Sequence, residues 1–174
     1  MPTTIDQYQA IIRAAAESKT LLRIHGGGTK DFYGNPAGEQ NSTLLDMTDY
    51  HGIVDYEPTE LVITARAGTR LADLEAVLDQ HGQMLAFEPP YFGAAATLGG
   101  CVAAGLSGPR RAAAGSVRDF VLGVRMLDGK SEDLHFGGQV MKNVAGYDVA
   151  RLMAGSMGTL GVLLEVSLKV LPKP

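Results

Sequence analysis

Hydrophobic positions near the start of the chain recur at the spacing of a helix. The sequence Thr-Ile-Asp-Gln that begins at Thr4 is typical of a capping box. The residues that follow at helical spacing are Ile5, Tyr8, Ile11, Ile12 and Ala15. The pattern therefore predicts an amphipathic helix that starts at Thr4 and packs one face against the rest of the protein.

Short apolar runs with strand character follow this helix. They occupy residues 21–24, 43–46, 53–56 and 61–66, and a polar loop separates the first run from the second. Thr69 stands where it could cap a helix over residues 70–80, and Gly82 where a glycine could end it. We therefore predict that residues 1–88 form a mixed α/β lobe.

The composition changes after Pro89-Pro90. Residues 93–108 are dominated by Gly and Ala, which indicates that the backbone comes close to another group there. Strands are predicted for residues 120–127 and 130–136, on either side of the hairpin signal Asp128-Gly129.

A helix over residues 147–154 and a strand over residues 161–170 complete the second half. Residues 89–174 are thus predicted to form a second lobe. The fold class that follows is α+β, with two α/β lobes that share a ligand.

Composition and charge narrow the function classes. The chain has 174 residues and a formal net charge of −4, which argues against a nucleic-acid or anionic-membrane surface. Its one cysteine, Cys101, excludes an internal disulfide and a multi-thiolate zinc site, so we expect no metal site and a reducing compartment. No signal peptide or transmembrane segment is expected, and the default location is cytoplasmic.

Three glycine-rich segments carry the candidate chemistry. Glycines follow a strand at positions 26–28, open a helix at 99–100, and precede the last strand at 155, 158 and 161. Glycine accepts positive φ and has no Cβ, so such segments can point several N–H groups at one anion. Thr97 could also cap a helix whose free N–H groups face the same anion. Any one cluster alone is equally typical of a tight turn. Together they favour a diphosphate ligand.

Other phosphate and glycine motifs fit less well. The dinucleotide pattern G-x-G-x-x-G is absent, and Gly26 to Lys30 lack the spacing of a Walker loop. Ala154-Gly-Ser-Met-Gly158 approaches a hydrolase nucleophile elbow, but no histidine follows it in the chain, as a hydrolase triad would require.

Read in order, the segments resemble the FAD-binding domain of the vanillyl-alcohol oxidase or p-cresol methylhydroxylase superfamily, and within it the E-type subunits of glycolate oxidase. The motifs that carry the resemblance are Arg23-Ile-His-Gly-Gly-Gly-Thr-Lys30, Pro90 with Thr97-Leu-Gly-Gly100, Gly115-Ser-Val-Arg-Asp119, Lys142-Asn-Val-Ala-Gly-Tyr-Asp148 and Gly155-Ser-Met-Gly-Thr-Leu-Gly-Val162. The likeness covers nearly the whole chain. It implies a PCMH-type fold with the flavin in the cleft between the lobes.

The resemblance also implies a set of cofactor-binding residues. They are Gly26, Gly27, Gly28, Thr29, Lys30, Pro90, Thr97, Leu98, Gly99, Gly100, Gly105, Ser107, Gly108, Gly115, Ser116, Arg118, Asp119, Gly158, Gly161 and Val162.

Departures from the family pattern qualify this expectation. Relatives with covalent flavin carry a histidine where this chain has Gly28, so non-covalent FAD is expected. Cys101 is interpreted as a small core residue and His25 as a strand-end side chain. Met157 replaces a glutamate of D-lactate dehydrogenase-like members. Arg110 and Arg111 are equally compatible with a cofactor or partner contact and with a solvated pair.

The implied function is an FAD-binding domain of a 2-hydroxyacid oxidase or dehydrogenase subunit of the glycolate or D-lactate type. The family's substrate cap domain is not in the sequence, so catalytic residues stay unassigned. The alternative is a non-catalytic assembly or docking subunit. Either way, the expected partners are a catalytic flavin subunit and an iron–sulfur subunit of a glycolate oxidase-like complex, through which the protein would lie at the periphery of the inner membrane.

Overall fold

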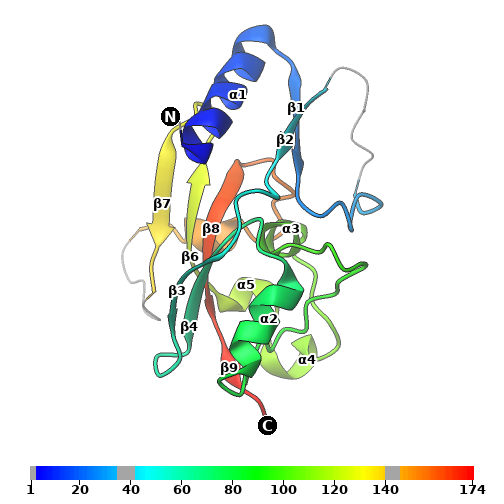
Figure 1. Ribbon diagram of the computed structural model, residues 1–174, viewed down its shortest axis with the longest axis vertical. Coiled ribbons are helices and arrows are strands. Elements are labelled where there is room, and N and C mark those ends of the chain that lie inside the picture. Colours follow the sequence, from blue (N-terminus) through cyan, green and yellow to red (C-terminus); the bar gives the residue numbers. More distant parts are fainter. Residues whose placement is uncertain (1–2, 35–41, 140–145) are drawn as a thin grey trace.

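A five-stranded antiparallel sheet forms the centre of the computed structural model, which describes residues 3–34, 42–139 and 146–174 (Figure 1). Its strand order is β3-β4-β8-β6-β7. The strands are β3 (Ile53–Glu57), β4 (Val62–Arg66), β6 (Val121–Leu127), β7 (Asp133–Gly137) and β8 (Val162–Lys169). β8 lies in the middle of the sheet, and six of its eight residues are buried.

Two smaller sheets flank the central one. β1 (Leu21–His25) pairs in parallel with β2 (Ser42–Asp46), and β5 (Gln83–Met84) pairs antiparallel with β9 (Leu171–Pro172). The parallel pair lies beside α1 at one end of the molecule, and the C-terminal strand lies beside α2 at the other (Figure 1).

Helices cover the sheets and bury two hydrophobic clusters. α1 (Thr4–Ser18) contributes Tyr8 and Ile12 to one cluster, which also contains Leu45 of β2 and Leu164 of β8. The larger cluster lies under α2 (Leu71–Asp79) and α3 (Leu98–Ala104). The remaining helices are single turns, α4 (Arg111–Ala114), α5 (Val117–Phe120) and α6 (Val149–Leu152). The glycine-rich start of α3 lies next to the end of β1, since a Cβ built on Gly26 would lie 2.5 Å from Thr97 Oγ1.

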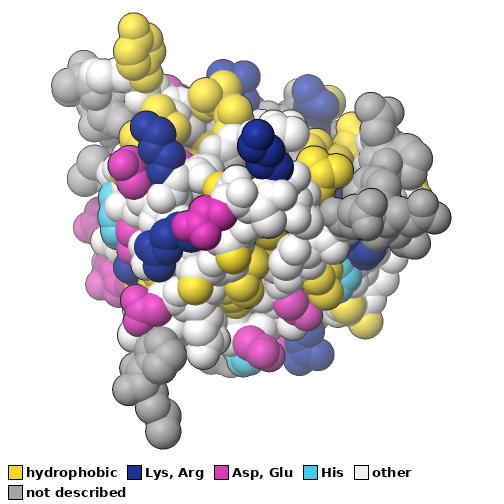
Figure 2. Space-filling model, turned by 90° about the horizontal axis from the view of Figure 1, so that it is seen from above, with side chains coloured by type: hydrophobic (Ala, Val, Ile, Leu, Met, Phe, Trp, Pro, Cys, Tyr) yellow, Lys and Arg dark blue, Asp and Glu magenta, His cyan; other side chains and the backbone are white. Residues whose placement is uncertain are grey.

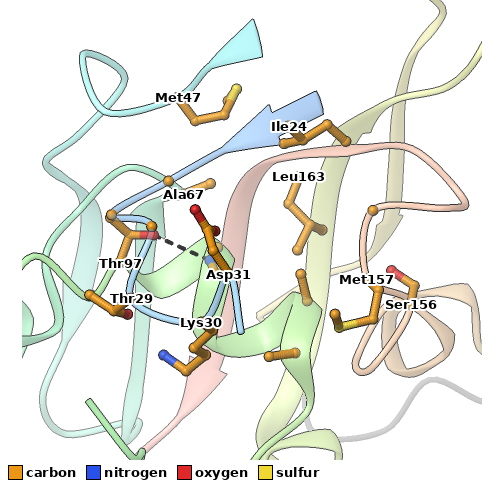
Figure 3. A pocket seen from close by; sticks show the side chains of 18 of the residues that line it. Ile24, Thr29, Lys30, Asp31, Met47, Ala67, Thr97, Ser156, Met157 and Leu163 are labelled. Carbon is orange, nitrogen blue, oxygen red and sulfur yellow. Dashed lines mark hydrogen bonds between the residues drawn. The ribbon is translucent and has the colours of Figure 1, made fainter. Parts of the chain in front are cut away.

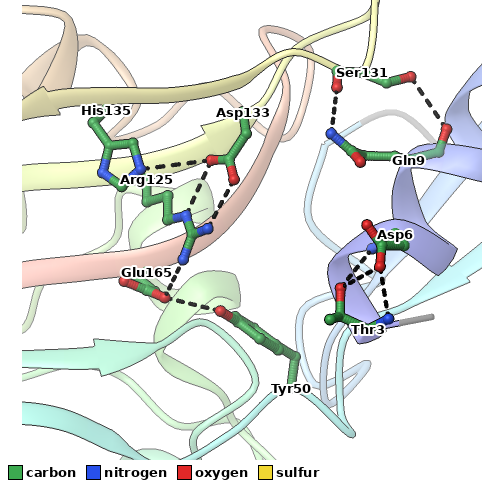
Figure 4. Close-up of polar contacts among 9 residues, drawn as sticks. All are labelled: Thr3, Asp6, Gln9, Tyr50, Arg125, Ser131, Asp133, His135 and Glu165. Atoms are coloured by element: carbon green, nitrogen blue, oxygen red, sulfur yellow. Dashed lines mark hydrogen bonds and ion pairs between the residues drawn. The ribbon is translucent and has the colours of Figure 1, made fainter. Parts of the chain in front are cut away.

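A charged network on the central sheet ties three strands to the loop after β2 (Figure 4). Arg125 donates to both carboxylate oxygens of Asp133, at 3.0 and 2.8 Å, and to Glu165 Oε1 at 3.0 Å. Tyr50 donates to the same oxygen of Glu165 at 2.8 Å. Burial raises the pKa of Tyr50 to about 12, with Glu165 adding to the shift. The network therefore fixes β6, β7 and β8 against the β2 loop.

Several element boundaries differ from the sequence prediction. The capping box of α1 is one residue earlier than predicted, because Thr3 caps the helix and exchanges hydrogen bonds with Asp6 (Figure 4). Thr69 does not cap α2. Its hydroxyl bonds to Gly52 instead, and α2 begins after Arg70, which gives no side-chain cap.

The hairpin and the following helix also differ. The loop between β6 and β7 spans residues 128–132 rather than the two residues Asp128-Gly129, because the Asp128 carboxylate accepts the N–H groups of Lys130 and Glu132 and widens the turn. The helix predicted over residues 147–154 is shorter in the structure, where α6 ends at Leu152. It begins after Asp148, whose carboxylate caps the helix by accepting the N–H of Arg151.

The predicted division at residue 88 passes through the central sheet. β3 and β4 come from residues 1–88, whereas β6, β7 and β8 come from residues 89–174. The sheets therefore do not separate at this position, and the assignment of two lobes stays a prediction.

Figure 2 shows the molecule from above, on the side of α1 and of the β1–β2 pair. Lys and Arg side chains on this face lie next to Asp and Glu side chains, with hydrophobic side chains between them. Arg23 at the β1 strand and Asp31 in the loop after it form an ion pair at 3.2 Å. This face therefore presents mixed charge.

Candidate functional site

The three glycine-rich segments meet at one cavity of about 160 Å³ between β1, α3 and the turn before β8 (Figure 3). The sequence-predicted residues that line it are Gly26, Gly27, Gly28, Thr29, Lys30, Thr97, Gly99, Gly100, Gly158 and Gly161. Segments that lie more than 50 residues apart in the sequence thus form a single concave site.

The loop after β1 supplies main-chain donors to this cavity. Within the described chain, the N–H groups of Gly27, Gly28 and Thr29 donate no hydrogen bond to another residue. Gly28 has φ +65, and a Cβ built on Gly27 would lie 1.6 Å from the Ala95 carbonyl oxygen. Both glycines are therefore required by the path of the loop. Successive free amides of this kind suit an anion such as a diphosphate.

The start of α3 differs from the prediction of free helix donors. Thr97 does cap the helix, since its hydroxyl accepts the N–H of Gly100 at 3.3 Å. However, Leu98 N donates to Thr69 O and Gly99 N donates to Ala67 O, each at 2.8 Å. These bonds tie α3 to the segment between β4 and α2, so the first donors of the helix are already used. The free amides come from the loop instead.

Lys30 brings a positive charge to the same cavity. Partial burial lowers the pKa of its ammonium, and the nearby Cys101 thiol acts in the opposite direction. Its Nζ lies 5.9 Å from the centre of the Phe92 ring, and no carboxylate of the described residues pairs with it. A partly desolvated cation without a counter-ion favours the binding of an anion.

Asp31 also lines the cavity and would repel an anion. Arg23 pairs with its carboxylate at 3.2 Å, which offsets that charge. The electrostatics of the site therefore favour a negatively charged group near Lys30 and the glycine loop.

Four other predicted residues lie in the core or in turns. Leu98 and Val162 are buried core residues, at 0% and 3% exposure. Gly105 has φ +68 and ends α3 next to Gly155. Pro90 is partly buried in the strained turn before Gly93. None of these four predicted residues lines the cavity.

The remaining predicted residues lie on the loops around α4 and α5, also outside the cavity. Ser107 Oγ accepts the N–H of Val117, and Gly108 N donates to the carbonyls of Phe87 and Glu88.

Ser116 and Asp119 form the capping box of α5, and Gly115 precedes the capping residue. Arg118 is exposed. Arg110 contacts Glu88 through its N–H at 2.7 Å, while Arg111 is exposed.

The family motif Lys142-Asn-Val-Ala-Gly-Tyr-Asp148 is described only in part. Its residues 142–145 lie outside the described residues. Tyr147 is 95% exposed, and Asp148 serves as the cap of α6.

The apolar walls of the cavity were not predicted from the sequence, and Ser156 and Met157 were named only as part of a family motif. Ile24, Met47 and Leu163 form apolar walls, and Ser156 and Met157 lie at the turn before β8 (Figure 3). Strand periodicity marks Ile24 and Leu163 as partly buried, but it does not indicate that a cavity borders them. For Met47 the sequence carries no comparable signal.

Cys101 is a core residue, as predicted. It is fully buried on α3, and burial raises the pKa of its thiol to about 12, with Lys30 opposing the shift. The thiol therefore stays protonated and unreactive near neutral pH.

The fold and the cavity, with its free amides and the Lys30 ammonium, are those expected of a domain that holds a phosphate-containing cofactor. The chain belongs to the family described as FAD binding domain, whose model matches residues 1–151. FAD is thus its cofactor, and the α+β class and PCMH-type fold expected from the sequence are confirmed.

Among characterised proteins, the chain is 57% identical to the glycolate oxidase subunit GlcE of Escherichia coli over 172 residues, which cover 97% of this chain and 48% of that protein. It is 29% identical to a D-lactate dehydrogenase of Anaerostipes hadrus, over 99% of this chain and 36% of that protein. Among solved structures, an alkyldihydroxyacetonephosphate synthase matches with a TM-score of 0.74 at 22% identity, over 96% of this chain and 30% of that one.

The chain spans about half the length of the E. coli relative and about a third of the D-lactate dehydrogenase. What the whole relatives do therefore does not transfer to it directly. Among the residues that the structure describes, no helix has both the length and the apolar composition needed to span a bilayer.

Proposed function

We propose that the chain is the FAD-holding part of a subunit of a 2-hydroxyacid oxidase or dehydrogenase of the glycolate or D-lactate type. The observation that carries the proposal is the convergence of the three glycine-rich segments, with the free amides of Gly27–Thr29 and the Lys30 ammonium, on one cavity. The identity of 57% to a glycolate oxidase subunit supports the substrate class.

Two groups of residues would bind different parts of the cofactor. The loop from Gly26 to Lys30 would hold the diphosphate, because it offers amides and a cation. The predicted loops 105–108 and 115–119, together with Pro90, would border the flavin ring. When bound, the isoalloxazine supplies the redox chemistry, and the protein contributes binding and orientation.

The flavin is proposed to be non-covalent. Gly28 offers no side chain for attachment, and the Cys101 thiol is buried, with its pKa raised to about 12. Denaturation of the loaded protein should therefore release FAD into the supernatant quantitatively.

A docking role is the second candidate, and an exposed aromatic pair favours it. Phe32 and Phe92 are 67% and 56% exposed, and their rings meet edge to face at 5.1 Å. Phe92 has φ +53, an uncommon conformation for a bulky residue. Large exposed aromatics are typical of surfaces that partners cover. The proposed partners are a catalytic flavin subunit and an iron–sulfur subunit, which would also hold the complex at the inner membrane.

Titration with FAD tests the first proposal. The folded chain should quench flavin fluorescence with one FAD per chain and micromolar or tighter affinity. Lys30→Met should weaken binding about tenfold and flatten its salt dependence, because one cation is lost near the diphosphate. Lys130→Met, on the exposed β6–β7 loop, is the matched control. A folded chain that binds no FAD at these concentrations would refute the proposal.

Reduction of the bound flavin separates the two roles. Bleaching by glycolate or D-lactate in the isolated chain would favour a catalyst. Bleaching only after the partner subunits are added would favour a docking module.

A further inference from the structure

Glu88 has a backbone conformation that its side chain disfavours. Its φ is +50, in the left-handed region, although the residue is neither glycine nor asparagine. Phe92 has φ +53, so residues with left-handed backbones stand on both sides of Pro89-Pro90. Such conformations persist only where the surrounding structure holds them, and they gather at functional sites. The contacts that hold Glu88 therefore indicate what this turn does.

The loop after α3 holds Glu88 through both its backbone and its side chain. Gly108 N donates to Glu88 O at 2.8 Å, and Arg110 N donates to Glu88 Oε2 at 2.7 Å. Arg110 Nε also lies 3.7 Å from Glu88 Oε1. A Cβ built on Gly108 would lie 2.7 Å from the Glu88 carbonyl oxygen, so the two backbones are in direct contact. Glu88 thus joins the turn over residues 88–92 to the loop over residues 105–110.

The hydrogen bond from the Arg110 backbone is the contact that determines the shape of this loop. The side chains of Arg110 and Glu88 are 38% and 43% exposed, so water screens their ion pair. The N–H of Arg110, in contrast, is fixed in the backbone immediately before α4. The carboxylate that accepts it must have the length to reach it from the turn. A shorter side chain at position 88 should therefore displace the loop, whereas loss of the charge alone should not.

The far end of the turn is fixed by α2. The Tyr91 hydroxyl donates to a carboxylate oxygen of Glu75, and the tyrosine packs against the larger core cluster. Pro89 and Pro90 stiffen the residues between the two ends, because the proline ring fixes φ. The turn is thus rigid, and Glu88 is the side chain through which it holds the loop.

We infer that Glu88 is a positioning residue for the flavin ring of FAD, because it holds the loop over residues 105–110 against the turn that contains Pro90. The inference rests on the proposed function, in which Pro90 and this loop border the ring. Glu88 acts through the loop and belongs to none of the motifs that carry the family resemblance. It lies outside the glycine cavity, so binding of the diphosphate should not depend on it.

Three substitutions at position 88 separate reach, charge and backbone conformation. Glu88→Gln keeps the length and an acceptor oxygen but loses the charge. Glu88→Asn suits the left-handed backbone but is one carbon shorter. Glu88→Gly also accepts this backbone and has no side chain. The control is Asp79→Asn, which breaks an exposed ion pair with Lys173.

For each variant we would measure the ligand-free Tm, the Kd values for FAD and ADP by titration calorimetry, and the visible circular dichroism of the bound flavin, which reports the surroundings of the ring. Glu88→Asn and Glu88→Gly should weaken FAD about fivefold, the effect of one lost hydrogen bond, and should change the dichroism spectrum at saturating FAD. Their affinity for ADP should equal that of the wild-type chain. Glu88→Gln and Asp79→Asn should match the wild-type chain in affinity and spectrum.

The inference would be overturned if Glu88→Asn kept the wild-type FAD affinity and spectrum, or if ADP binding weakened as much as FAD binding. An equal effect of Glu88→Gln and Glu88→Asn would show that charge rather than reach matters, and would overturn it as well. Loss of folding in both Glu88→Asn and Glu88→Gly would overturn it in favour of a purely structural role. Failure of the wild-type chain to bind FAD would instead refute the function on which the inference rests.

Discussion

At Gly27 the glycine loop and the segment before α3 touch through their backbones. The Cβ of an alanine at this position would lie only 1.6 Å from the Ala95 carbonyl oxygen, which is far closer than two non-bonded atoms can approach. Neither partner is a flexible side chain, so the loop itself would have to move. The same residue therefore determines both the packing of two segments and the direction of the neighbouring amides.

Gly27→Ala should lower the free energy of unfolding by about 1–3 kcal/mol, through overpacking, and should abolish tight FAD binding because the loop is displaced. Gly129→Ala is the control, since its added Cβ meets no atom within 4 Å. Urea unfolding and FAD titration of both variants check this. A Gly27→Ala protein with wild-type stability and affinity would show that the two segments do not approach as described.

At the level of elements, α3 links the core to the cavity. Its capping residue Thr97 is 4% exposed, and the helix is tied to the segment after β4 by two backbone hydrogen bonds. Weakening the cap should therefore affect stability and binding together. α1 has a comparable cap at Thr3, far from the cavity.

Thr97→Ala and Thr3→Ala should each cost about 1 kcal/mol of folding free energy, the usual contribution of an N-cap side chain. Only Thr97→Ala should also weaken FAD several-fold, because Gly99 and Gly100 of α3 line the cavity. Thermal denaturation and FAD titration measure the two effects. Equal losses of affinity in both variants would contradict a specific role for α3.

The sequence predicts elements better than it predicts how they meet. β8 and α3 were predictable because an apolar run and a Thr-capped glycine pair are local signals. Other features depend on contacts that local sequence patterns do not encode. They are the widened β6–β7 loop and the hydrogen bonds from Leu98 N to Thr69 O and from Gly99 N to Ala67 O. Met47 and Leu163 were not predicted as cavity walls for the same reason, since their place beside the cavity depends on how distant segments meet.

For the whole molecule, the Arg125 network makes stability depend on pH. Hydrogen bonds from Arg125 lower the pKa of Asp133, and burial partly opposes them. Because the folded pKa lies below that of the unfolded chain, the stabilisation is present above the ordinary aspartate range near about pH 4 and is lost as the pH falls through the folded pKa.

Urea unfolding between pH 7 and pH 3 should therefore show a steady loss of stability at the acid end. Asp133→Asn should lower stability at pH 7 by about 1–2 kcal/mol and make the acid-side slope shallower. The slope should not vanish, because local hydrogen bonds also lower the pKa of Asp6, Asp46 and Asp119. An unchanged slope in Asp133→Asn would argue against the network.

The central place of β8 has a consequence for how the protein emerges from the ribosome. β3 and β4 form one hairpin and β6 and β7 another, and β8 is the strand that joins the two. Until residues 162–169 have been synthesised, β4 and β6 each present an open edge, the kind that invites wrong pairing with other chains. The sheet of the nascent chain therefore stays open, and exposed to wrong pairing, until residues 162–169 have left the exit tunnel.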